Sequence, residues 1–168
     1  FLRTIYLYPM ALSFIVTGTA WKWILNPSLG LEKFAIDIGF ETFTFDWLVT
    51  PGMSIYTIVI AGVWQSSGFI MAIFLAGLRS VDDEIIKAAK IDGAGLIAVY
   101  LKIILPMMRP VFMSAIVILV HLAIKSYDLV IALTAGGPGI SSDMPAVFMT
   151  QMAFHRSEIG LASASAIM

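Results

Sequence analysis

The chain has 168 residues, of which 60% are hydrophobic and only 12% are charged, and its mean hydropathy is +0.94. Soluble domains carry about a quarter charged residues, so this composition indicates that most of the chain lies in a lipid bilayer. A formal net charge of −1 argues against a nucleic-acid partner, and the lack of cysteine excludes disulfides, thiolate catalysis and cysteine zinc sites.

A helix needs about 20 mainly apolar residues to cross the ~30 Å hydrocarbon core. Residues 4–25 and 53–78 meet this requirement, and residues 107–134 meet it if Lys125 and Asp128 are accepted within the span. Residues 144–154 are too short to cross and predict an interfacial or re-entrant helix. The apolar residues from 159 onward predict the start of a further span. We therefore expect an all-α membrane domain over residues 1–168, which the Phe at position 1 and the apolar final residues indicate to be a fragment.

The distribution of basic residues predicts the orientation of these spans. Residues 26–51 contain one basic residue, Lys33, whereas residues 79–109 hold five of the ten Lys and Arg residues. Short cytoplasmic loops carry the excess of positive charge, so residues 79–106 are predicted to lie in the cytoplasm. Residues 26–51 and the glycine-rich turn at 134–139 then lie outside.

The cytoplasmic loop begins with a predicted short amphipathic helix. Asp82 or Asp83 is suited to the N-cap, and Asp83 and Lys87 have the spacing of an ion pair along a helix. Val81, Ile85 and Ala88 are expected to form the apolar face. Gly93 and Gly95 permit a sharp turn, for which we expect little room around Gly93. These features predict a docking element on the cytoplasmic side.

The spacing in this loop resembles the EAA loop of ATP-binding-cassette importer permeases. That pattern is Glu-Ala-Ala, three residues, Gly, nine residues, Ile, one residue and Leu-Pro, and this chain matches it at Ala88-Ala89, Gly93, Ile103 and Leu105-Pro106. Lys87 stands in place of the pattern's Glu, and Glu84 lies one turn earlier. The resemblance implies that residues 82–95 form a coupling helix held by a cytoplasmic ATPase. It assigns the contact to Glu84, Lys87, Ala88, Ala89, Asp92 and Gly93.

Other phrases resemble the carbohydrate branch of the same family. They are "FLAGLRSV" before the loop, "KIDGA" within it and "SYDLVIALTAGGPG" after it, and "HLAIKSYDLVIALT" is most similar to the α-glucoside permeases. The resemblance implies a sugar substrate, a cytoplasmic ATPase dimer that binds the ATP, a second homologous permease subunit and an extracytoplasmic solute-binding protein. It also implies a multi-pass location in a bacterial inner membrane, with no cofactor on this chain.

Ionisable and polar groups within spans mark the candidate solute path, because their burial in lipid costs at least about 2.5 kcal/mol for Lys or Asp. His121, Lys125 and Asp128 fall on one face if residues 107–134 form a single helix. That face either lines the path together with Tyr127 or only pairs Lys125 with Asp128. Trp64 and Gln65 in the second span are candidates for sugar contact, whereas the adjoining Ser66, Ser67 and Gly68 favour helix packing.

Alternative functions are less consistent with the sequence. A permease for a glycerol phosphate or a polyol is the nearest alternative, but a phosphorylated solute favours several basic residues along the path, and only Lys125 is available. A channel or secondary transporter is a second alternative. An intramembrane enzyme is disfavoured because neither H-E-x-x-H nor G-x-S-x-G occurs, and His155 has no partner at metal-binding spacing.

Overall fold

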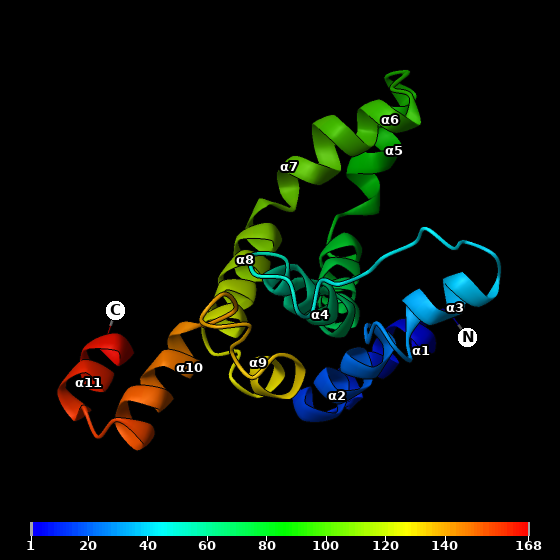
Figure 1. Ribbon diagram of the computed structural model, residues 1–168. Helices are drawn as coiled ribbons and strands as arrows, with labels where there is room; N and C mark the ends of the chain where they lie inside the picture. Colours follow the sequence, from blue (N-terminus) through cyan, green and yellow to red (C-terminus); the bar gives the residue numbers. More distant parts are fainter. Residues whose placement is uncertain (1, 168) are drawn as a thin grey trace.

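The computed structural model describes residues 2–167, which form helices and connecting segments without any strand in that range (Figure 1). The expected all-α class is therefore confirmed. Met168, the end of the predicted last span, lies outside the described residues. In Figure 1 the helices α5 to α7 project as an arm from the group formed by α2, α4, α8 and α9, and α10 and α11 lie at the opposite end.

The N-terminal apolar run is broken into shorter helices. It comprises α1 (Leu2–Leu7), the 3₁₀ turn η1 (Tyr8–Ala11) and α2 (Phe14–Ile24). Pro9 lacks the backbone N–H that a continuous helix needs, and the Ser13 hydroxyl caps a new helix by accepting the Val16 N–H at 3.3 Å. The single helix expected over residues 4–25 is thus not formed. Helix α3 (Leu31–Asp37) follows.

Helix α4 (Ser54–Arg79) agrees closely with the predicted second span. Its 26 residues correspond to about 39 Å at 1.5 Å per residue, which exceeds the hydrocarbon thickness. Among the described helices, α4 is the single helix that is long and apolar enough to cross a membrane. Two further helical segments, joined at a bend, reach this length and apolar character only when they are taken together.

That bent pair begins in the arm. After α5 (Asp83–Ile91), the chain returns through α6 (Leu96–Val99), the π-helical turn η2 (Tyr100–Ile104) and α7 (Leu105–Met107), and then bends by 61° into α8 (Arg109–Ile124). The bend lies between Pro106 and Pro110. Neither proline can donate a backbone hydrogen bond, which explains why the helix changes direction there.

The C-terminal third is also segmented. Helix α8 ends at Ile124, residues 125–127 form a break, and α9 (Asp128–Leu133) runs in a different direction from α8 (Figure 1). The chain continues through α10 (Pro145–Thr150), the π-helical turn η3 (Gln151–His155) and α11 (Ile159–Ile167). The continuous helix expected over 107–134 is therefore interrupted at Met108 and again at 125–127.

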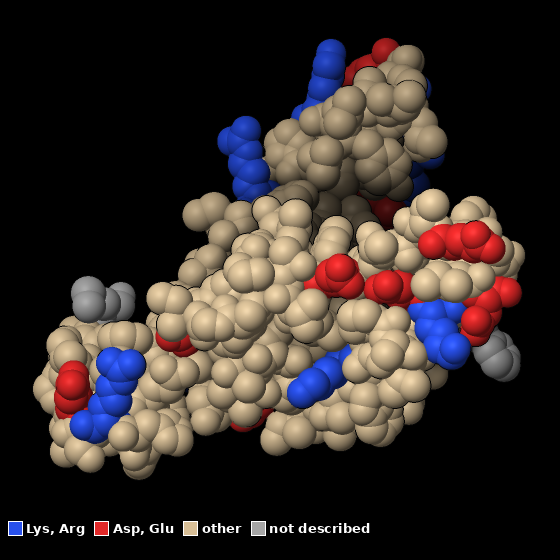
Figure 2. Space-filling model, in the orientation of Figure 1, with Lys and Arg blue, Asp and Glu red and all other residues tan. Residues whose placement is uncertain are grey.

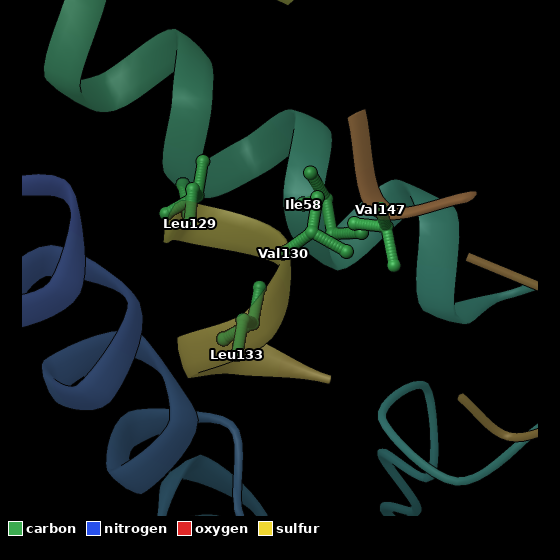
Figure 3. Packing of buried hydrophobic residues seen from close by; sticks show 6 residues of the cluster. Ile58, Leu129, Val130, Leu133 and Val147 are labelled. Atoms are coloured by element: carbon green, nitrogen blue, oxygen red, sulfur yellow. The ribbon is translucent and has the colours of Figure 1, made fainter. Parts of the chain in front are cut away.

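The main core lies where α9 packs between α2 and α4 (Figure 3). Its fully buried residues are Ile58, Ala61, Leu129, Val130, Leu133 and Val147. Gly18 of α2 permits the close approach of α9, because a Cβ atom at this position would lie 2.7 Å from the Ala132 Cβ and 3.1 Å from the Leu129 carbonyl oxygen. The position of α9 therefore depends on a residue without a side chain on α2.

Gly18→Ala is expected to lower the thermal unfolding midpoint of the full-length subunit, at a cost of about 1–3 kcal/mol, because α2 and α9 must separate to admit a methyl group. Gly160→Ala on α11 is the matched control, since a Cβ there meets nothing within 4 Å. An unchanged midpoint in Gly18→Ala would show that the contact contributes little to stability.

Candidate functional site

The arm is a helical hairpin closed by its own apolar seam. Helix α5 packs against the returning segment from α6 to α7, and the buried residues of the seam are Val81, Ala89, Val99, Ile104 and Met108. Partly buried Phe74, Ile86, Ile103 and Val111 cover the seam. Because most of these residues belong to the arm itself, residues 81–108 can hold their shape while projecting from the rest of the chain.

The face of α5 that packs against the seam is shifted by one residue along the helix from the expected apolar face. Ile86 and Ala89 face the seam, whereas Ile85 and Ala88 are exposed. Only Val81 of the expected apolar face is buried. Ala88 is therefore available to a partner, whereas Ala89, only 8% exposed, holds the hairpin together.

The start of α5 agrees with the predicted cap. The Asp82 carboxylate accepts the Glu84 N–H at 2.9 Å, and Asp83 and Glu84 add negative charge to the first turn, where the helix dipole favours it. The expected pairing of Asp83 with Lys87 is wrong, because the two described side chains form no ion pair. The charged side chains of the α5 outer surface thus face solvent.

The end of the arm is apolar and exposed. Ile91, Leu96 and Ile97 are 86%, 67% and 75% exposed, and they surround the turn between α5 and α6. Glu84, Lys87, Ala88 and Asp92 are exposed on the same outer side of the hairpin. Figure 2 shows Lys and Arg together with Asp and Glu on the arm, and a further group of Asp and Glu over α3 and its surroundings. The arm therefore offers an apolar tip flanked by charges, as a docking element requires.

Gly93 was expected at the turn because of little surrounding room, but its backbone conformation is what requires a glycine. Its φ of +82° lies in the left-handed region that disfavours residues with a Cβ, but a Cβ built there meets nothing within 4 Å. The requirement at Gly93 is thus a backbone conformation and not room. Gly95 has an ordinary φ of −65°.

Two sequence-predicted path residues, Trp64 and Gln65, have structural contacts. The Trp64 ring meets Trp21 edge to face, with centroids 5.9 Å apart. Gln65 is only 5% exposed, and its Nε2 donates to the Leu12 carbonyl oxygen at 2.8 Å. This bond ties α4 to the break before α2, so Gln65 holds the backbone of the N-terminal segment.

The other predicted path residues are not brought together on one face. His121 lies on α8, Lys125 in the break and Asp128 at the start of α9, and all three are exposed. The expectation of one shared helical face is wrong because the helix ends at Ile124. Lys125 and Asp128 form no ion pair within the described part of the chain. Of the predicted set, Tyr127 alone lines a cavity described below.

Two cavities lie beside residues 126–131, where the break ends and α9 begins. A cavity of about 250 Å³ between α4 and α8 is almost wholly apolar, with Ser66 and Ser126 as its hydroxyl groups. A second, of about 300 Å³, lies between α9 and the α10–η3 helix and is lined in part by Tyr127, Gln151, His155 and Arg156. The sequence analysis missed Ser126, Gln151 and Arg156. It considered His155 only as a metal ligand, and no cluster of three potential ligands occurs within residues 2–167.

Comparison with known proteins defines the family. The whole chain, residues 1–168, matches the family of binding-protein-dependent transport system inner membrane components, and the chain belongs to this family. Membership in a family of inner membrane components places the chain in a membrane. The expected resemblance to carbohydrate importer permeases is confirmed by named sugar permeases among its relatives.

A probable ABC transporter permease of Pyrococcus horikoshii is 38% identical over 165 residues, which cover 98% of this chain and 56% of that protein. The xylose/arabinose import permease XacH of Haloferax volcanii is 36% identical, covering 99% of this chain and 52% of XacH. The crystal structure of a bacterial alginate ABC transporter in complex with an alginate pentasaccharide-bound periplasmic protein matches with a TM-score of 0.83, 21% identity and coverage of 99% of this chain and 58% of that chain. This chain thus spans about half the length of the curated relatives that it matches.

Ala89→Leu is expected to loosen the arm, because a larger side chain in the seam overpacks it by about 1–3 kcal/mol. Hydrogen exchange of residues 83–107 in the full-length subunit should then accelerate. Ala88→Leu is the matched control, since Ala88 is exposed and the same change there should leave exchange within the arm unchanged. Equal exchange in the two variants would contradict the assignment of the inward face.

Proposed function

We propose that this chain is the greater part of the membrane domain of a carbohydrate ATP-binding-cassette importer permease, a multi-pass protein of the inner membrane. Family membership and the sugar import named for a relative support the proposal. The permease itself performs no reaction. It provides part of the path for the solute, and the energy comes from ATP bound and hydrolysed by a separate subunit.

The observation that carries this proposal is the self-contained arm of residues 81–108. Its seam makes it stiff, while Ile91, Leu96 and Ile97 leave an apolar tip exposed that must be covered to be stable in water. Such an element suits insertion into a cleft of a cytoplasmic ATPase dimer. Glu84, Lys87, Ala88, Asp92 and the Gly93 turn would contact the ATPase, and Ala89 would act from inside the hairpin.

A second homologous permease and an extracytoplasmic solute-binding protein complete the proposed assembly. The family is described as binding-protein-dependent, and the alginate transporter of similar fold was solved in complex with a periplasmic protein. Many apolar side chains of the chain, such as those along α8, are exposed and suit contact with lipid or with a second subunit.

The proposed solute path borders the apolar cavity between α4 and α8. Its hydrocarbon side chains can pack against the apolar faces of sugar rings, and the Ser66 and Ser126 hydroxyls can exchange hydrogen bonds with sugar hydroxyls. Ser126 Oγ is buried and has no hydrogen-bond partner within residues 2–167. A buried hydroxyl of this kind favours a polar ligand beside it.

Transport requires the docked arm to interact differently with the two states of the ATPase, since a ligand shifts a conformational equilibrium only by its differential affinity. The arm continues through the 61° bend into α8. Rotation of the arm by the closing ATPase would therefore tilt α8, which lines the cavity. The proposed transport mechanism is therefore alternating access.

The proposal is tested by assembling the full-length subunit with the products of neighbouring genes and measuring ATP hydrolysis over a panel of sugars. At least one sugar of the panel, neutral or acidic, should stimulate hydrolysis several-fold in the presence of the binding protein. A glycerol phosphodiester or a polyol as the sole stimulant would replace the sugar assignment. Lack of stimulation by any solute, with uptake that persists without ATP, would favour a channel or secondary transporter.

Gly93→Val should insert into the membrane normally but lose most solute-stimulated hydrolysis, because a β-branched residue at a φ of +82° costs about 1–2 kcal/mol or more and displaces the turn. Gly95→Val is the matched control, since its φ suits any residue and a Cβ meets nothing within 4 Å. Full coupling in Gly93→Val would count against the arm as the coupling element.

A further inference from the structure

The cavity between α9 and the α10–η3 helix has a chemistry unlike that of the apolar cavity beside α4. Its volume is about 300 Å³. One wall is apolar, formed by Ile131, Ala135 and Val147, and the rest carries Tyr127, Thr150, Gln151, His155 and Arg156. An apolar wall with a few convergent polar groups is the usual composition of a site for a small molecule.

The π-helical turn η3 brings the polar groups together. An α-helix advances about 100° per residue, so Arg156 would point well away from Gln151 in a regular helix. Here the Arg156 N–H donates to the Gln151 carbonyl oxygen at 3.1 Å, five residues earlier. The wider turn lets His155 and Arg156 both lie beside Gln151 at the same cavity. Single π-helical turns occur frequently at functional sites.

Hydrogen-bond donors dominate this cavity. Arg156 has five N–H groups, and the Gln151 amide, the His155 imidazole and the Tyr127 hydroxyl each supply at least one more donor. The Thr150 hydroxyl donates to the Ala146 carbonyl oxygen at 2.8 Å, so its proton is already used. No acidic residue lines the cavity, and Arg156 forms no ion pair with any residue in 2–167. The complementary ligand is rich in acceptors and negatively charged.

We infer that this cavity binds a sugar unit that carries a carboxylate, a hexuronate. The planar fork of Arg156 matches the two oxygens of a carboxylate, and Gln151 and His155 can donate to neighbouring hydroxyls. The Tyr127 ring and the apolar wall suit the hydrocarbon face of a pyranose. A volume at the lower end of the range for ligand sites limits the occupant to about one sugar unit. The choice of a sugar over another carboxylate rests on the proposed function.

The test is equilibrium binding of radiolabelled D-glucuronate to the full-length subunit, assembled with its partners in nanodiscs and without ATP. Saturable binding is expected, with D-glucose and acetate each competing at least tenfold more weakly than unlabelled D-glucuronate. Arg156→Gln should weaken binding by about tenfold to a hundredfold, the value of a hydrogen-bonded charge. Arg156→Lys, which keeps the charge but loses the fork, should give a smaller loss.

Arg109→Gln is the matched control, because it removes the same charge from an exposed position outside this cavity and should leave binding unchanged. The thermal unfolding midpoint of each variant shows whether it has folded. Binding that survives Arg156→Gln in a folded subunit would overturn the inference, as would equal competition by D-glucose, acetate or inorganic phosphate. Since no ATP is present, an importer that fails to couple ATP hydrolysis can still bind the hexuronate, so the two proposals can fail separately.

Discussion

The packing of α9 between α2 and α4 is the constraint on which the rest of the structure depends. Helix α9 has only six residues, Asp128–Leu133, and three of them, Leu129, Val130 and Leu133, lie in the core. Gly18 allows the backbone of α9 to approach α2 closely. This packing draws the chain away from the axis of α8. It produces the break at residues 125–127, separates Tyr127 from the α8 face and forms one side of each of the two cavities.

The sequence predicted the features that depend on local chemistry. The apolar length of α4, the Asp82 cap and the glycine turn of the arm each follow from a few neighbouring residues. The inward face of α5 could not be predicted in this way. Two candidate pairs, Ile85 with Ala88 and Ile86 with Ala89, have the same spacing and the same residue types. Only the position of Val99 and Ile104 on the returning segment decides between the two faces.

The candidate path residues were predicted less well, since their placement depends on tertiary contacts. Apolar length could not locate the break after Ile124, which follows from the packing of α9. The cluster of Gln151 and Arg156 was missed because helical periodicity separates residues five apart, and only the π-helical turn places them together. Gln65 was correctly identified as an unusual polar residue within a span, but its amide N–H donates to the Leu12 carbonyl oxygen, and its Oε1 is buried without a hydrogen-bond partner among the described residues.

Helix α9 has one further consequence through the two cavities on its sides. Ser126 and Leu129 belong to the lining of one, and Tyr127 and Ile131 to that of the other. Helix α9 and the residues just before it therefore separate the two cavities. A sideways shift of α9 that enlarges one cavity therefore reduces the other. A ligand that pushes α9 away from the polar cavity would in this way narrow the apolar cavity.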